Sequence, residues 1–493
     1  MTLLWLNEMS DLICVFDIGT TGARTIVFDV YGKEIARSYE EYPTIKQPVG
    51  VSEQDPEVWW NSVKNTCNRV MNKVNVNDII AISAGILRVN CTILDRDRKP
   101  LYPMIIAMDE RGVDFDKEDG LRLSLPKILW IKQERPDLYE KIYKITFPDT
   151  YIYMKLCEND LLITEPTNGI YGIMDIKTQK WDQELADKYD LPIDLWPEIR
   201  TPGEILGDIS AKTAKELGLK TNIPVILGGG DQQCSALGMG VINKGQAKIT
   251  MGTYTFANLV TGDEPAVPPG GDIPIFSFPH VIKGKYMLEG AMPGTGIALK
   301  WFKDNFSRLL IKKSEENNLD IYDLLSQEAK EVKPGSEGLL FIPLQMFRKG
   351  TIYGMGWNHT RAHMVRSIME ASALSAQMYL GLIEAVNHSK STEVVADGGG
   401  MNSDVWAQIL ADVTNRKIII PENKDCSALG AAILGFWGNG IYSNIEDAIQ
   451  NMVRFEKEFN PIQENVKVYK KLNRLFMPTV LDLYNKNRIT KNL

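Results

Sequence analysis

Two short stretches of the sequence place glycine and threonine between apolar runs, where they could hold phosphate. In the first, "FDIGTTGARTIVFD", Gly19, Thr20, Thr21 and Gly22 separate two apolar segments, and Asp17 comes just before them. Such a turn leaves backbone N–H groups unobstructed and adds two hydroxyls, which suits the oxygens of a phosphate group. The stretch predicts a β-hairpin that can hold phosphate, although a glycine-rich hairpin with nothing bound would have the same sequence.

The same pattern occurs again in the second half of the chain. "MGTYTFANLV" aligns without a gap with "IGTTGARTIV", so Gly252 and Thr253 take the places of Gly19 and Thr20. Two such turns, one near the start of each half, indicate a duplicated architecture that grips a phosphate chain from both sides of a cleft. The chain contains neither GxxxxGK[ST] nor GxGxxG, so a P-loop and a Rossmann fingerprint are excluded.

Two further segments run from an apolar strand through three glycines into a helix. In "IPVILGGGDQQCSALGMG" the glycines lead to Asp231, and in "TEVVADGGGMNSDVW" they lead to Asn402 or Ser403 as the helix cap. Proteins of the α/β class often bind phosphate and nucleosides at this junction. Tight packing of strand against helix is the alternative explanation for both segments.

The remaining patterns are also those of an α/β protein. Residues 34–42 continue the first hairpin as a third strand, and Asp55-Pro56 begins an amphipathic helix. Residues 362–387 predict a long, mostly buried helix, and residues 464–484 predict a helix near the C-terminus.

Composition narrows the possible functions. The chain has 493 residues, of which 44% are hydrophobic and 24% charged, so two globular domains are expected. A formal charge of −8 without a basic cluster argues against a nucleic-acid or anionic-membrane surface, and leaves small molecules as partners. The six cysteines are scattered, and no apolar run is long enough to span a bilayer. We therefore expect a cytoplasmic protein in a reducing compartment.

Taken together, the motifs resemble the FGGY family of carbohydrate kinases over nearly the whole chain. The resemblance rests on "DIGTTGAR", "GVSEQDPEVWW", "GGGDQQCSALGMG", "MGTYTF" and "DGGGMNSDVWAQILADVTNRKIIIP" followed by "DCSALGAAILG", in the family's order. It implies an α/β fold with two ribonuclease-H-like domains of the actin and hexokinase type on either side of a catalytic cleft. The expected domains are residues 10–245 and 246–493, with ATP, Mg²⁺ and a small sugar or polyol as ligands, and a homodimer is possible.

The resemblance also implies roles for individual residues. Asp17 resembles the carboxylate near the magnesium ion, and Asp231 resembles the catalytic base. The residues that look like nucleotide ligands are Gly19, Thr20, Thr21 and Arg24 in the first phosphate loop, Gly252 and Thr253 in the second, Gly296 beside the phosphates, and Gly399, Gly400, Met401 and Asn402 around adenosine.

The role of Asp231 also makes chemical sense. A sugar hydroxyl attacks a γ-phosphoryl group well only if its proton is removed as the new bond forms, and an aspartate at the cleft can accept that proton. The alternative is that Asp231 merely caps the helix that follows it.

The residues expected to bind the sugar or polyol differ from those of the best-known members of the family. The resemblance places Arg88, Asp109, Asn168, Asp231 and Gln232 at the substrate, but "ILRVN" has Val89 where glycerol kinases carry glutamate. In "AMDER" the Trp-Gln pair that usually precedes the aspartate is also missing. These features look similar to the autoinducer-2 kinase branch, so a pentulose, a related polyol or an autoinducer-2-like substrate ranks above glycerol.

Three alternatives remain beside this interpretation. A glycerol-kinase-type enzyme would phosphorylate a shorter polyol, and an actin-like ATPase of the same fold would hydrolyse ATP without an acceptor. A sugar sensor that has lost catalysis is the third, although neither end of the chain carries a DNA-binding helix-turn-helix.

Overall fold

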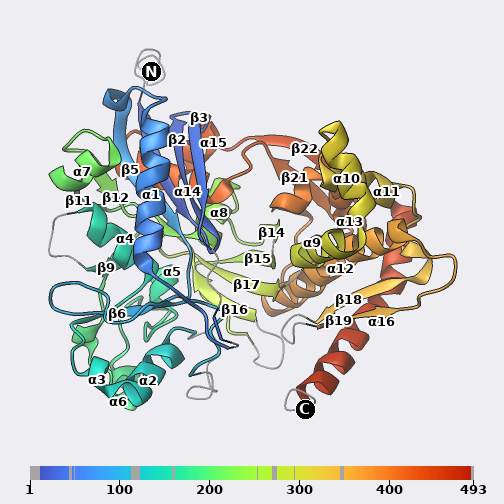
Figure 1. Cartoon of the computed structure of the whole chain (residues 1–493), viewed down its shortest axis with the longest axis horizontal. Helices are drawn as coiled ribbons and strands as arrows, with labels where there is room; N and C mark the ends of the chain where they lie inside the picture. Colours follow the sequence, from blue (N-terminus) through green and yellow to red (C-terminus); the bar gives the residue numbers. More distant parts are fainter. Residues whose placement is uncertain are drawn as a thin grey trace.

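The computed structural model describes residues 11–43, 47–48, 50–112, 123–157, 162–252, 254–268, 275–293, 295–344 and 349–489. The chain forms two lobes, each built around a seven-stranded sheet (Figure 1). This architecture confirms the predicted α/β fold with two sheet-containing domains. No helix within the described residues is long and apolar enough to cross a membrane.

The first sheet has the strand order β11-β12-β5-β1-β2-β3, and β13 also pairs with β5. Both faces of β1 are buried, because Cys14 and Phe16 belong to one core cluster while Ile13 and Val15 belong to another. The predicted hairpin and its third strand are confirmed as β1, β2 and β3. The strands are β1 Leu12–Ile18, β2 Gly22–Asp29, β3 Glu34–Glu41, β5 Ile79–Ile86, β11 Ile205–Asp208, β12 Pro224–Ile226 and β13 Gly229–Gly230.

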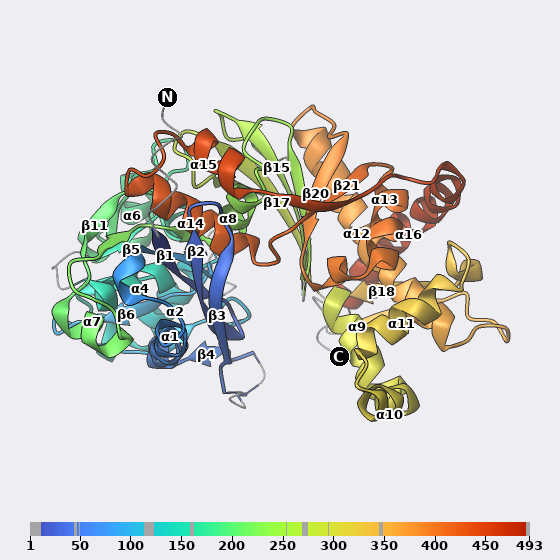
Figure 2. The ribbon, with the colours of Figure 1, turned by 90° about the horizontal axis from the view of Figure 1, so that it is seen from above.

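Helices from distant parts of the chain cover the two faces of this sheet (Figure 2). Helix α1 (Pro56–Met71), capped by Asp55 as predicted, packs on one face. The other face is covered by α8 (Asp231–Gly238) together with α14 (Cys426–Gly438) and α15 (Ile445–Met452). The division at residue 245 stays a prediction, but two helices that it assigns to the second domain pack on the first sheet.

The second sheet has the strand order β16-β17-β15-β14-β20-β21-β22. Its core includes α12 (Arg361–Val386), which confirms the long buried helix, together with α9 (Thr295–Phe306), α11 (Ile321–Lys330) and α13 (Asp404–Thr414). A separate cluster, including Val260 and Met287 from this sheet and Ala236 from α8, joins the lobes. The strands are β14 Ala247–Met251, β15 Tyr254–Gly262, β16 Ile275–Pro279, β17 Tyr286–Pro293, β20 Glu393–Asp397, β21 Lys417–Pro421 and β22 Phe455–Phe459.

The remaining elements complete the two lobes. The predicted C-terminal helix is present as α16, which includes Pro478. The other helices are α2 Leu125–Glu134, α3 Pro136–Tyr139, α4 Pro148–Leu156, α5 Pro166–Gly169, α6 Gln183–Tyr189, α7 Ala211–Leu217, α10 Arg308–Asn317 and α16 Gln463–Ile489. The short strands are β4 Glu53–Gln54, β6 Thr92–Leu94, β7 Met104–Ile105, β8 Lys144–Thr146, β9 Ile163–Thr164, β10 Glu198–Ile199, β18 Leu340–Leu344 and β19 Lys349–Tyr353.

Candidate active site

The first glycine-threonine turn closes the β1–β2 hairpin. Gly19 N–H donates to the Gly22 carbonyl at 3.0 Å, and the side chains of Thr20 and Thr21 are exposed. A side chain at Gly22 would collide with the Glu40 carbonyl of β3, 2.5 Å away, so glycine is required there. The exposed hydroxyls are thus available to a ligand.

Asp17 and Arg24 face each other across this hairpin, because the antiparallel register pairs them directly. Arg24 Nη1 donates to Asp17 Oδ2 at 2.9 Å, and Arg24 Nε lies 3.6 Å from Asp425 Oδ1 at the start of α14. Burial raises the pKa of Asp17 despite the opposing effect of Arg24. A buried carboxylate of this kind would be stabilised by a further cation.

The second turn joins β14 to β15, where Gly252 N–H donates to the Tyr254 carbonyl at 2.9 Å. Thr253 lies outside the described residues, so the prediction that the two turns face each other stays open. Gly296 is the second residue of α9.

The glycines that follow β20 pack against the end of β14. Gly398 has φ +91°, and a side chain there would meet the backbone of Met251 at 2.7 Å. Gly399 faces open space, whereas Gly400 is buried. This contact places the predicted adenosine glycines beside the strand that leads to the second phosphate turn.

The next two residues differ in exposure. Met401 is buried in the core of the second lobe, so only its main chain could meet a nucleotide. Asn402 is exposed, and Ser403 is the cap of α13, one of the two residues expected to play that part.

Asp231 is the first residue of α8 and stands about one third exposed, with 34% of its side chain accessible. Its Oδ1 accepts a hydrogen bond from the Gln232 N–H at 2.8 Å and another from Arg88 Nε at 3.1 Å. The residue that occupies the cap position is Gly230, and no side-chain cap bond forms there. Asp231 instead satisfies the N–H of Gln232 from within the first turn, so its carboxylate also serves the helix terminus.

Arg88 is buried and bridges the two lobes. Its Nη2 donates to both oxygens of Glu289 on β17, at 2.9 and 3.1 Å, while its Nε holds Asp231. The guanidinium carbon lies 5.0 Å from the ring centre of Phe278 and 5.8 Å from that of Tyr171. Burial would lower the pKa of Arg88, but the nearby carboxylates raise it; its Nη1 is buried with no hydrogen-bond partner among the described residues.

Asn168 lies on α5 in the shell around this arginine. Glu165 holds it through the Asn168 N–H at 3.0 Å and the amide nitrogen at 3.2 Å, while its Oδ1 is buried without a partner. The neighbouring Thr167 Oγ1 accepts from the Gly230 N–H at 3.0 Å, which ties α5 to the residue before Asp231. The structure thus brings Asn168, Arg88 and Asp231 into one region.

The loop that carries Arg88 has an unusual backbone. Val89 has φ +77°, which is costly for a β-branched residue and is found mostly at functional sites. Its carbonyl accepts from Ser124 Oγ at 2.9 Å and Lys127 Nζ at 3.0 Å, and burial lowers the pKa of Lys127 to about 8. The amide of Asn90, next in the chain, is buried without a partner.

Asp109 belongs to a different cluster. Its carboxylate accepts from Arg111 Nε and Nη2, at 2.9 and 2.7 Å, and from the Ser52 N–H at 2.8 Å. Burial would raise the pKa of Asp109, but these hydrogen bonds outweigh it and lower the pKa. A role for Asp109 at the substrate stays a prediction, since its oxygens already have partners.

Sequence reasoning missed two charged residues at this site, Lys248 and Glu289. Lys248 on β14 is fully buried, and its Nζ donates to Gln232 Oε1 at 2.9 Å and to Ser235 Oγ at 3.0 Å. Since an ammonium group only donates, it holds the Gln232 amide with the oxygen inward. The sequence did carry a signal for both residues, because each is the single charged residue of an otherwise uncharged strand. Lys248 stands in "AKITM" and Glu289 in "YMLEGAMP".

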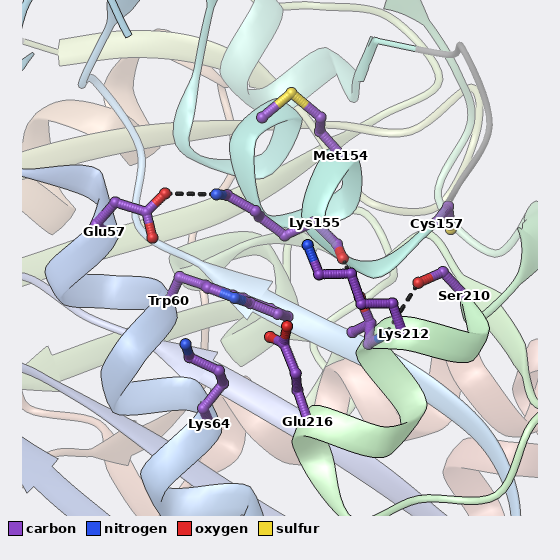
Figure 3. Close-up of a pocket in the computed structure, with 10 residues that line it drawn as sticks. Glu57, Trp60, Lys64, Met154, Lys155, Cys157, Ser210, Lys212 and Glu216 are labelled. Atoms are coloured by element: carbon purple, nitrogen blue, oxygen red, sulfur yellow. Dashed lines mark hydrogen bonds and ion pairs between the residues drawn. The ribbon is translucent and has the colours of Figure 1, made fainter. Parts of the chain in front are cut away.

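A cavity of about 340 Å³ lies elsewhere, between α1, α4 and α7 (Figure 3). Glu57 and Lys155 form an ion pair at its edge, and Trp60 also lines it. None of the predicted site residues lines this cavity, so it is separate from the site around Asp231.

Comparison with known proteins tests the family resemblance of the motifs. The chain matches the N-terminal domain of the FGGY family of carbohydrate kinases over residues 12–117 and 122–238, and the C-terminal domain over residues 247–438. The chain belongs to this family. It is therefore an ATP-dependent carbohydrate kinase, as the motifs indicated.

One curated relative and two solved structures illustrate what the chain is similar to. The chain is 28% identical over 504 residues to an autoinducer-2 kinase of Salmonella paratyphi B, covering 94% of this chain and 93% of the relative. Its fold is similar to that of a gluconate kinase from Lactobacillus acidophilus, with a TM-score of 0.84 and 23% identity over 96% and 98% of the two chains. A ligand-bound xylulose kinase from the same organism has a TM-score of 0.84 and 23% identity over 97% and 99%.

Proposed function

We propose that this kinase transfers the γ-phosphoryl group of ATP to a hydroxyl of a pentulose, a related polyol or an autoinducer-2-like acceptor. The observation that carries the proposal is the placement of Asp231, partly exposed at the start of α8 and held through one carboxylate oxygen. Around it lie Arg88 and Asn168, which both keep buried polar atoms without partners. Polar atoms of this kind are suited to the hydroxyl and carbonyl groups of an acceptor.

The proposed reaction follows from these positions. The acceptor oxygen forms a bond to the γ-phosphorus while the bond from that phosphorus to the β–γ bridging oxygen breaks, so ADP leaves. Asp231 accepts the hydroxyl proton as the new bond forms. Arg88 Nη1 and the Asn168 and Gln232 amides orient the acceptor.

The nucleotide end is proposed to use mainly backbone groups. Gly19, Thr20, Thr21 and Arg24 bind phosphate oxygens from the first lobe. The second lobe contributes Gly252 and Thr253, with Gly296 beside the phosphates and Gly399, Gly400, Met401 and Asn402 around adenosine.

Magnesium fits beside Asp17. Mg²⁺ commonly takes one or two protein carboxylates together with phosphate oxygens and water, and it spreads the charge of the transferring phosphate. Within the described residues, no group of three or more His, Cys, Asp or Glu side chains is placed to hold a metal ion. Asp17 offers a buried carboxylate, and Asp425 lies near the same arginine.

The choice of acceptor rests on the sequence around Arg88 and on the autoinducer-2 kinase relatives. Val89 cannot accept a hydrogen bond through its side chain, so glycerol would lose the carboxylate partner that glycerol kinases provide. We therefore expect glycerol to be a poor substrate.

The test is an ATP-consumption screen across autoinducer-2, pentuloses, tetritols, glycerol, aldonates and inositols, with ATP alone as the control. Turnover that requires a pentulose, polyol or autoinducer-2 supports the proposal, and detection of the phosphorylated product completes it. Equal turnover with glycerol would contradict the expected preference, and equal turnover with ATP alone would indicate an ATPase without an acceptor.

A further inference from the structure

Glu289 has a position that calls for an explanation, because it is a buried carboxylate of the second lobe that reaches into the acceptor site of the first. It lies on β17, directly opposite Asn258 of β15 in the antiparallel register. Asn258 Nδ2 donates to Glu289 Oε2 at 2.9 Å, so the carboxylate is anchored within its own sheet. From there it accepts two hydrogen bonds from Arg88 Nη2.

The guanidinium group of Arg88 is divided between two carboxylates. Nε and Nη2 lie on the same side of a guanidinium group and together form the fork that commonly binds a single carboxylate through both oxygens. Here Nε binds Asp231 Oδ1 at 3.1 Å, whereas Nη2 binds Glu289. Asp231 therefore meets only one nitrogen of the fork.

This division matters for Asp231. Its Oδ1 already accepts from Arg88 and from the Gln232 N–H. Proton transfer from an acceptor hydroxyl needs a carboxylate oxygen within hydrogen-bond reach, and Oδ2 is the oxygen that this arrangement leaves for it. If both nitrogens of the fork turned to Asp231, Oδ2 would become part of a bidentate ion pair.

We propose that Glu289 is a positioning residue that holds Nη2 of Arg88 away from Asp231 and so keeps one oxygen of the catalytic carboxylate available. The inference rests on the proposed function of Asp231 as the base. It also couples the lobes, since the carboxylate that holds Arg88 in place comes from the second lobe while Arg88 and Asp231 belong to the first.

The main test is the Glu289→Gln variant, which keeps the shape of the side chain but removes its charge. We expect kcat to fall by about ten- to a hundredfold, the cost of a misplaced catalytic group, while the KM for ATP stays within about threefold. In the Asp231→Asn background the same change should lower kcat no further, because Glu289 acts through Asp231. A fall of equal size in both backgrounds would overturn the proposal.

Glu384→Gln is the matched control. Glu384 is also a buried carboxylate of the second lobe, bound to Arg416 and to the N–H and hydroxyl of Ser391, but it lies outside the proposed site. This variant should lose thermal stability while keeping its kcat. The conservative change Glu289→Asp, which retains the charge, should restore most of the activity lost in Glu289→Gln.

Two measurements keep the proposal open to refutation. A crystal structure of Glu289→Gln without acceptor should show Arg88 Nη2 within hydrogen-bond distance of Asp231 Oδ2, and an unchanged Arg88 would overturn the proposal. If Glu289→Gln does not fold, Asn258→Ala is the second variant, because it removes the hydrogen bond that anchors the Glu289 carboxylate. It should lower kcat by about threefold or more. An unchanged kcat would contradict the proposed role of Glu289. A wild-type protein that phosphorylates no acceptor refutes the proposed function, whereas the crystal structure still decides the role of Glu289.

Discussion

Two arginine–carboxylate clusters in this protein use the same chemistry to different ends. Arg111 binds Asp109 through two nitrogens and also contacts Glu53, all within the first lobe. Arg88 instead divides its nitrogens between Asp231 of the first lobe and Glu289 of the second. The first arrangement occupies the carboxylate, whereas the second leaves a nitrogen of the arginine unpaired and the aspartate partly exposed.

The comparison shows why residue type alone does not identify a site. The resemblance placed Arg88 and Asp231 of one cluster, and Asp109 of the other, at the substrate. A carboxylate whose oxygens are all paired mainly stabilises the fold, while buried polar atoms without partners are costly unless a ligand satisfies them. Four substitutions test this distinction.

Asp231→Asn should have the largest effect. Asparagine keeps the shape of the side chain but cannot accept the hydroxyl proton, so kcat should fall by about two to four orders of magnitude. ATP affinity should change little, because the proposed phosphate ligands lie at the two hairpin turns and near Asp17. Steady-state kinetics measure kcat, and ATP-binding calorimetry measures the affinity for ATP. Turnover close to that of the wild type would show that Asp231 is not the base.

Arg88→Ala should raise the KM for the acceptor by about tenfold or more, with a smaller change in the KM for ATP. Since Arg88 also holds Asp231, kcat should fall as well. Initial rates measured with each substrate varied in turn separate these effects. An effect confined to ATP would place Arg88 in the nucleotide half and weaken the contrast with Arg111.

Asp109→Asn tests the other cluster and should act mainly on stability. Loss of the charge-assisted bonds to Arg111 should lower the free energy of unfolding by about 1–3 kcal/mol, as measured in urea. The KM for the acceptor should change less than in Arg88→Ala. A larger rise in that KM than Arg88→Ala produces would show that Asp109 binds the substrate after all.

Lys127 lies between the two clusters. Its replacement by methionine should have the smallest effect of the four substitutions, a change in how the free energy of unfolding depends on pH. Burial lowers the pKa of Lys127 to about 8 in the folded state, whereas the unfolded chain holds this proton up to about pH 10.5. The unfolded state therefore binds more protons between these values, and the cost of burying the charge diminishes as pH rises through this window. In Lys127→Met this dependence is absent.

The measurement is the free energy of unfolding of both proteins at pH 7 and pH 9. The wild-type protein should gain about 1 kcal/mol relative to Lys127→Met over this interval. Lys212→Met, at an exposed lysine that lines the separate cavity, is the matched control. Parallel pH curves for the wild type and Lys127→Met would mean that Lys127 is not desolvated by its position beneath Val89.

The features that the sequence predicted correctly are those set by neighbours in the chain. The hairpin at Gly19–Gly22 and the cap at Asp55 depend on turn and capping chemistry within a few residues. The long helix α12 follows from a run of apolar residues that is easily read. The start of α8 at Asp231 was likewise visible from the three glycines before it.

Tertiary structure alone decided the partners of these residues. Arg88 and Glu289 are 201 positions apart, and α14 covers the first sheet although it follows every strand of the second sheet except β22 in the chain. The sequence by itself determined the elements and the family, because hydrophobic periodicity, turn chemistry and spaced motifs act locally. Which carboxylate an arginine binds, and which polar atom stays unpaired, depends on how two separate sheets pack, because only that packing removes water from the charges between them.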